Sequence, residues 1–246
     1  MRRPEFIEPD WPLPPGVCAV VTTRVGGYSR APFDSFNLGD HVGDAPAAVG
    51  ANRELLRTVL ELPAEPCWLE QVHGTEVVEA APANLGAAAD GSVAMRGGEV
   101  CAVLTADCLP VLLCNTAGDR VAALHAGWRG LAAGVIEAGL ARMETPPGQI
   151  LAWLGPAIGP HRYEVGEEVF RAFVDPAPET ASAFVRSRPG HWRADLYRLA
   201  RYRLSVMGVN RIHGGNFCTA SAPERFYSYR RDGRTGRMAS LIWLQR

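Results

Sequence analysis

The chain has 246 residues, of which 47% are hydrophobic and 21% are charged, and its formal net charge is −1. This balance is that of an ordinary globular protein, and the length suits one domain covering residues 1–246. The near-neutral charge excludes a nucleic-acid or anionic-membrane surface built on excess positive charge. Every basic residue is an arginine, which excludes a Schiff-base lysine and a lysine-containing phosphate loop.

The cysteines are scattered and form no C-x-x-C pair, so we expect reduced thiols and a cytoplasmic location rather than a disulfide framework. The opening segment MRRPEFIEPDWPLPPG lacks the unbroken apolar run of a signal peptide. No apolar stretch reaches the ~18 residues of a membrane-spanning helix. We therefore predict neither a secretion signal nor a transmembrane segment.

Taken in chain order, the hydrophobic pattern predicts one α/β domain with strands throughout. Short apolar runs predict strands at 17–23, 67–69, 75–79, 99–105, 109–114, 120–124 and 150–154. Helical spacing is found at 46–60, 131–143, 167–174 and 195–207. An Asp-Gly turn separates two further runs and predicts a terminal hairpin of 226–230 with 238–244.

The stretch ADCLPVLLCNTAGDRVAALHAGWRG, residues 106–130, carries most of the candidate chemistry. If 109–114 pairs antiparallel with 120–124 across the NTAGD turn, position 111 faces 123 and position 109 faces 125. This register brings Cys108 and His125 to the same end of one hairpin, with Asp107 adjacent. A thiolate beside an imidazole suits either Zn²⁺ or a Cys–His nucleophile pair, so these three residues are the catalytic candidates.

Two further motifs extend this candidate site. The sequence AGWRG after His125 predicts a helix N-terminus, where backbone N–H groups and Arg129 could bind an anion. In EQVHGTEV, His73 lies in a short loop that ends in glycine. If His73 met Cys108, two histidines and one cysteine would leave a zinc position open for catalysis, but spacing alone does not select it over the other histidines.

The sequence resembles the YfiH/laccase-domain family over nearly its whole length. The resemblance rests on QVHG, TADCLPVLL and HAGWRG in this order, and also on TTRVGGYS, FNLGDHVGD, GPAIGPHRYEVG, NFCT and FYSYRRDGRTGRMASLIWL. The segment ADGSVAM departs from the family's usual ADALVT-like pattern but retains Asp90. The resemblance implies metal ligation by His73, Cys108 and His125. It also implies an α-β-β-α layered fold with mixed sheets, similar to the deamidase domain of cytotoxic necrotizing factors.

The resemblance further implies a zinc-dependent purine nucleoside phosphorylase acting on adenosine, inosine and S-methyl-5′-thioadenosine, with adenosine deaminase activity. Zn²⁺ is the expected cofactor and Cu²⁺ the alternative. Nucleosides and phosphate are the expected partners, with no nucleic acid or membrane, and the chain is expected to be a monomer or homodimer. The candidate substrate and phosphate ligands are Arg129, Arg24, Arg231 and Asn37.

Three other functions remain open at this point. Cys108 and His125 could form a Cys–His amidase that edits peptidoglycan precursors, a role that the resemblance also implies. A copper-dependent polyphenol oxidase is disfavoured, because six histidines without an H-x-H pair are few for a blue-copper site plus a multinuclear cluster. A non-catalytic metal or nucleotide sensor would favour four ligands, whereas three are apparent.

Overall fold

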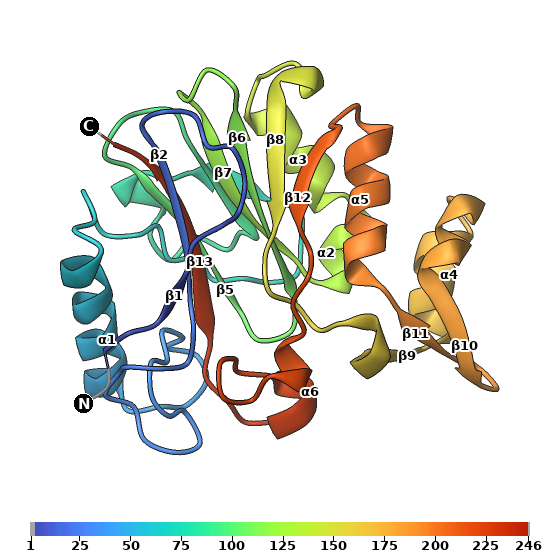
Figure 1. The fold of residues 1–246 in the computed structure, drawn as a ribbon, viewed down its shortest axis with the longest axis horizontal. Coiled ribbons are helices and arrows are strands. Elements are labelled where there is room, and N and C mark those ends of the chain that lie inside the picture. The colour runs from blue at the N-terminus through green and yellow to red at the C-terminus, as the bar shows by residue number, and fades with distance from the viewer. Residues whose placement is uncertain (1–2, 246) are drawn as a thin grey trace.

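The computed structural model describes residues 3–245, and two β-sheets packed face to face form its centre (Figure 1). The first sheet is antiparallel, in the order β1 (Phe6–Ile7), β2 (Val17–Thr22), β13 (Met238–Leu244) and β5 (Val100–Thr105). The second sheet is mixed, because its two edge pairs are parallel and its inner pairs antiparallel. Its order is β12 (Arg211–Gly214), β8 (Ile150–Leu154), β6 (Leu109–Asn115), β7 (Val121–Ala126), β4 (Gly91–Ala94) and β3 (Val77–Glu79).

Helices cover the outer faces of both sheets (Figure 1). Helix α1 (Pro46–Val59) packs on the first sheet. The second sheet is covered by α2 (Trp128–Ala133), α3 (Val135–Arg142) and α5 (Leu196–Val206). The short α6 (Tyr229–Asp232) precedes β13. A small antiparallel sheet stands to one side with α4 (Glu167–Val174), and its strands are β10 (Phe184–Arg188), β11 (His191–Ala194) and β9 (Glu164–Gly166). The 3₁₀ turns are Pro82–Asn84, Pro147–Gln149, Pro160–Arg162, Pro178–Ala183 and Thr219–Ser221.

Period-two side-chain alternation explains why the central strands read as continuous apolar runs. Along β13, Met238 and Ile242 enter the core between the sheets, whereas Leu241 enters the core beneath α1. Along β6, Leu112 faces the first sheet and Val111 faces the helices. Both faces of β6 and β13 are therefore buried. The prediction of one α/β domain with mixed sheets is confirmed.

The β6–β7 hairpin is present, but the expected register is wrong by one residue. Val111 pairs with Leu124 instead of position 123. The reason is the turn: the Asn115 side chain accepts hydrogen bonds from the backbone N–H groups of Asp119 and Arg120, at 3.1 and 3.2 Å. Six residues, 115–120, therefore lie between the paired positions Cys114 and Val121, where five were expected. The start of β6 and the end of β7 still pair with each other, so Cys108 and His125 lie at the same end of the hairpin, as predicted.

The predicted terminal hairpin is wrong. Residues 229–232 form α6 because the Ser228 hydroxyl caps this turn by accepting from the Arg231 backbone N–H at 3.2 Å. Strand β13 pairs with β2 and β5 instead. The predicted helix 131–143 is also divided, because Gly134 lies at φ 105° and ends α2 before α3 begins.

Several short strands had no clear pattern in the sequence: β1, β4, β9, β10, β11 and β12. Conversely, the predicted strand at 67–69 is reduced to a single bridge between Cys67 and Cys101, and that at 75–79 to β3. Strands of two to five residues give too few alternations to detect, and their pairing partners are distant in sequence. None of the helices found within residues 3–245 has both the length and the apolar character needed to cross a membrane.

Candidate metal centre

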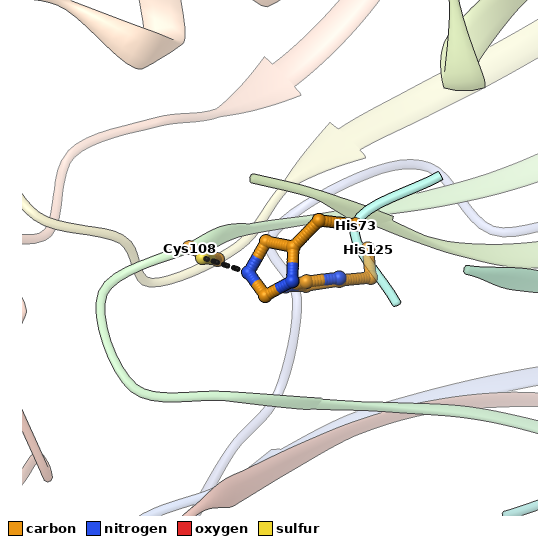
Figure 2. A group of neighbouring side chains, drawn as sticks. All are labelled: His73, Cys108 and His125. Atoms are coloured by element: carbon orange, nitrogen blue, oxygen red, sulfur yellow. Dashed lines mark hydrogen bonds between the residues drawn. The ribbon is translucent and has the colours of Figure 1, made fainter. Parts of the chain in front are cut away.

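His73, Cys108 and His125 converge from three separate segments (Figure 2). Cys108 immediately precedes β6, His125 lies near the end of β7, and His73 lies in the loop before β3. Their ligand atoms all lie within 4.8 Å of one another, and Cys108 Sγ is 3.9 Å from His73 Nε2. The two imidazole rings meet edge to face, with centroids 4.8 Å apart. The structure thus brings together the three residues that the sequence predicted.

The backbone of the HAGWRG motif makes room for this cluster. A Cβ atom on Gly127 would lie 2.9 Å from His73 Cδ2 and 3.0 Å from Cys108 Sγ, inside the group of ligands. A Cβ on Gly130 would lie 2.8 Å from the carbonyl oxygen of Gly74. The absence of a side chain at Gly127 therefore leaves space between His73 and Cys108. Its absence at Gly130 lets the His73 loop pack closely against α2.

Asp90 fixes two of the three ligands from behind. Its buried carboxylate lies 2.7 Å from His125 Nδ1, which turns Nε2 of that ring toward the cluster. It also accepts backbone hydrogen bonds from His73 at 2.9 Å and Gly74 at 2.6 Å, and from Val72 at 3.2 Å. Because His73 has φ 61°, a conformation that costs a non-glycine residue energy, these bonds hold a strained loop in place.

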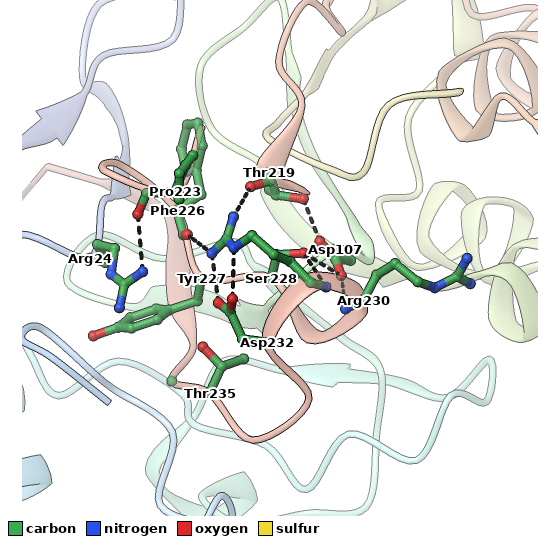
Figure 3. A network of polar contacts seen from close by, with 12 residues as sticks. Arg24, Asp107, Thr219, Pro223, Phe226, Tyr227, Ser228, Arg230, Asp232 and Thr235 are labelled. Atoms are coloured by element: carbon green, nitrogen blue, oxygen red, sulfur yellow. Dashed lines mark hydrogen bonds and ion pairs between the residues drawn. The ribbon is translucent and has the colours of Figure 1, made fainter. Parts of the chain in front are cut away.

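Asp107, the third catalytic candidate, makes hydrogen bonds to distant parts of the chain (Figure 3). Its carboxylate accepts hydrogen bonds from Thr219 Oγ1 at 2.5 Å, Ser228 Oγ at 3.0 Å and the Arg230 backbone N–H at 2.7 Å. The backbone of Asp107 lies at φ 95°. This buried side chain therefore ties the segment before β6 to the chain around α6, and its lone pairs face these donors.

The Cys108 thiol and the His125 imidazole shift each other's pKa. Burial acts to raise the pKa of Cys108, but the charge and hydrogen bonding of His125 and His73 outweigh it and lower the pKa to about 6. Burial acts to lower the pKa of His125, whereas the Cys108 thiolate and Asp90 raise it to about 9. The site thus favours a thiolate, which is the form of cysteine that binds a metal.

The donor set fits a metal ion. One thiolate and two imidazoles are typical zinc ligands, and a carboxylate behind a ligating histidine is the usual outer support. Gly127 leaves the space between the donors free, and His125 is buried while His73 is exposed toward the open side. Three ligands around an accessible position are typical of a catalytic centre, whereas a structural zinc is closed by four.

The cluster lies in the wall of a cavity of about 360 Å³, within the usual range for small-ligand sites. The metal-ligating residues share this wall with aromatic side chains and with arginines from α2 and the chain around α6. The lining side chains used below are Trp128, Arg129, Tyr163, Tyr229, Arg230 and Arg237.

Of the four predicted substrate ligands, only Arg129 lines this cavity. The Arg24 guanidinium pairs with Asp34 and donates to the Pro223 carbonyl. The Arg231 guanidinium is held by Asp232 and two backbone carbonyls. Asn37 is fully buried and organises its own loop. These three are engaged in holding the structure together elsewhere.

Sequence reasoning did not single out Tyr163, Arg230 and Arg237 as individual site residues. Arg230 and Arg237 belong to the arginine-rich motif FYSYRRDGRTGRMASLIWL, and both line the cavity. Tyr163 lay in the motif GPAIGPHRYEVG without a role. The many arginines and tyrosines in the arginine-rich motif were the available signal. Because the segment was wrongly predicted as a hairpin, the sequence could not indicate which of its arginines face the cavity.

Comparisons with known proteins agree over the whole chain. Residues 18–245 match a family described as multi-copper polyphenol oxidoreductase laccase. Purine nucleoside phosphorylase PA4543 of Pseudomonas aeruginosa is 57% identical over 241 residues, which cover 98% of each chain. Purine nucleoside phosphorylase YfiH of Escherichia coli strain K12 is 52% identical over 98% of this chain and 99% of its own.

Solved structures show the same fold. The crystal structure of Neisseria meningitidis protein NMB0706 superposes with a TM-score of 0.95 at 52% identity, covering 98% of this chain and 99% of that one. The YfiH structure from Bacillus licheniformis gives a TM-score of 0.88 at 31% identity over 93% of both chains. With the family's QVHG, ADC and HAGWRG motifs meeting in one cluster, the chain belongs to the YfiH/laccase-domain family.

Proposed function

We propose that this protein is a zinc-dependent purine nucleoside phosphorylase acting on adenosine, inosine and S-methyl-5′-thioadenosine, with adenosine deaminase activity. The observation that carries the proposal is the open His73, Cys108 and His125 centre in the wall of a ligand-sized cavity. Close relatives named purine nucleoside phosphorylases, at 57% and 52% identity over nearly the full chain, support it.

Each residue of the centre has a distinct role in this proposal. His73 Nε2, Cys108 Sγ and His125 Nε2 would hold the ion, and Asp90 keeps the His125 ring in the orientation that presents Nε2. When bound, zinc would supply a Lewis acid that polarises substrate or water. Trp128 and Tyr229 give the cavity apolar faces suited to a purine and a ribose.

The charge of the cavity wall supports an anionic co-substrate. Three arginines line it, namely Arg129, Arg230 and Arg237, and none forms an ion pair within residues 3–245. The single lining carboxylate, Asp107, is satisfied by three hydrogen-bond donors. A cavity with this balance attracts anions such as phosphate.

The experiment that tests the function is product analysis. Zinc-loaded protein is incubated with adenosine, with and without phosphate, and the products are separated by chromatography. We expect adenine and ribose 1-phosphate only with phosphate, and inosine in both samples. His125→Ala, carried through the same purification, should form neither product, which excludes a contaminating enzyme. Absence of both activities in the unmodified protein would contradict the proposal.

A Cys–His amidase is the second candidate, and the adjacency of the Cys108 thiolate and His125 favours it. In that case an alkylating agent would abolish activity on a peptidoglycan precursor, and a chelator would not. If zinc is the catalyst, bound metal protects Cys108 and the chelator removes activity. The two treatments therefore separate the candidates on one preparation.

A copper oxidase is less well supported. Within residues 3–245, His73, Cys108 and His125 are the single group of three or more side chains that could hold a metal. A laccase needs a blue-copper site and a separate multinuclear cluster. An intense blue absorption in the copper-loaded protein would favour this function over the phosphorylase.

A further inference from the structure

Tyr163 is an unusual residue in the cavity wall. Its side chain is nine-tenths buried, with 9% exposed, and it lines the same cavity as the metal cluster. Its hydroxyl has no hydrogen-bond partner within the part of the chain that the structure describes. A buried tyrosine hydroxyl normally finds a partner, so this donor is available to a ligand.

Two arginines flank this tyrosine. The Arg230 guanidinium lies 5.2 Å from the centroid of the Tyr163 ring, and its Nη1 donates to the Glu164 carbonyl at 2.7 Å. The Arg129 guanidinium lies over the Trp128 ring, 4.4 Å from its centroid, and has no hydrogen-bond or ion-pair partner among residues 3–245. Both side chains are exposed at the cavity, so both retain N–H donors for a ligand.

The Tyr163 hydroxyl is a neutral donor in this wall. Burial, and after it the negative charge of Cys108, raises the pKa of Tyr163 well above its ordinary value, so the phenol stays protonated at neutral pH. Asp107 acts in the same direction, whereas Arg230 and Arg129 act in the opposite one. Arg129, Arg230 and Tyr163 line the same cavity, and Arg230 lies against the Tyr163 ring. One neutral donor and two forked cations in one cavity wall suit a tetrahedral oxyanion.

We propose that Tyr163, Arg129 and Arg230 form the subsite for the attacking inorganic phosphate. This inference rests on the proposed phosphorylase function. A phosphate oxygen held there forms the new bond to C1′ of the nucleoside as the bond from C1′ to N9 breaks. The purine leaves with the electron pair and takes up a proton from dihydrogen phosphate, which yields free base and ribose 1-phosphate.

Three conservative variants test the subsite. Tyr163→Phe removes the hydroxyl and keeps the ring beneath Arg230, and Arg129→Gln and Arg230→Gln remove one charge each. Each should raise the KM for phosphate by about ten-fold or more. The arginine variants lose a charge-assisted hydrogen bond to phosphate, and Tyr163→Phe loses the hydrogen bond from the hydroxyl. The KM for adenosine, the zinc content and the phosphate-independent formation of inosine should stay within about two-fold of the unmodified enzyme.

The matched control is Arg162→Gln, because Arg162 is exposed, adjacent to Tyr163 in sequence and outside the cavity lining. It makes the same charge change and should leave the KM for phosphate unchanged. An equal rise in the control would show a long-range charge effect and overturn the subsite. An unchanged KM in the three variants, with weaker inhibition by adenosine 5′-monophosphate, would also overturn it and assign the residues to a nucleotide phosphate.

Binding of phosphate alone separates this inference from the proposed function. We would follow the ³¹P line width of inorganic phosphate on titration with the zinc-loaded protein and no nucleoside. Broadening that is reduced in the three variants supports the subsite even if phosphorolysis is absent, in which case only the proposed function fails. Phosphorolysis in the unmodified enzyme with equal broadening in all variants contradicts the subsite and leaves the function standing.

Discussion

Gly127 determines whether the three ligands can share one ion. Its backbone, at φ −61° and ψ 158°, suits alanine as well as glycine, so Gly127→Ala should fold. The added methyl group would stand 2.9 Å from His73 Cδ2 and 3.0 Å from Cys108 Sγ. We therefore expect at least a ten-fold loss of zinc affinity with an unchanged circular dichroism spectrum.

The measurement is zinc per chain after equilibration with a competing chelator. Gly50→Ala is the matched control, because a Cβ at that helical position meets nothing within 4 Å. It should bind zinc normally and be slightly more stable, since alanine favours the helix interior. Full zinc binding by Gly127→Ala would show that the cluster can move apart and that the close fit is not required.

At the scale of elements, the buried Asp107 carboxylate connects α6 to the segment before β6 that carries Cys108. In Asp107→Asn, a neutral amide replaces a charged acceptor, so the hydrogen bonds to Thr219, Ser228 and Arg230 lose their charge assistance. We expect a fall of about 1–3 kcal/mol in the free energy of unfolding, measured in urea.

Asp232→Asn provides the comparison for this variant, because Asp232 pairs with Arg231 in the same helix but is partly exposed. A partly exposed pair contributes about 1 kcal/mol or less. Equal losses in the two variants would mean that burial of the Asp107 network adds nothing. Displacement of α6 should also raise the KM for phosphate in Asp107→Asn, because the backbone N–H of Arg230 is one of its donors.

The same elements show what the sequence could and could not predict. The β6–β7 hairpin was predictable because its contacts are local, and it placed Cys108 beside His125. His73 lies close to Cys108 and His125 because Asp90 forms hydrogen bonds with both the His73 loop and His125. Contacts between residues so far apart in sequence produce no recognisable spacing. Only the family resemblance supplied that third ligand. All three residues of the candidate metal cluster were thus predicted, whereas of the arginines that line the cavity only Arg129 was.

For the molecule as a whole, the layered packing places the six cysteines in very different surroundings. Cys101 and Cys114 lie in the core between the sheets, and burial raises the pKa of Cys114 to about 12 and that of Cys101 higher still. Burial also raises the pKa of Cys67 to about 11 and raises that of Cys18. The pKa of Cys108 is instead lowered to about 6, because the two histidines outweigh its burial.

This contrast predicts selective alkylation of the zinc-free protein. A thiol with a pKa near 6 is mostly thiolate at pH 7, so Cys108 should react far faster than the four cysteines of raised pKa. Its rate should fall as the pH drops below about 6, because protonation removes the nucleophile. Peptide mass spectrometry after brief iodoacetamide treatment at pH 5, 6, 7 and 8 would show this. His125→Gln removes the main cation and should shift the midpoint upward.

Zinc should protect Cys108 at every pH where it binds, which links the chemistry of the thiol to the occupancy of the site. Phe184→Leu, in the outlying small sheet, changes no ligand and should label like the unmodified chain. If Cys108 instead reacted slowly at pH 7, and the pH midpoint of its alkylation rate were that of a free thiol, His125 would not be stabilising the thiolate. The donors would then be brought together by the metal alone, not held ready by the folded chain.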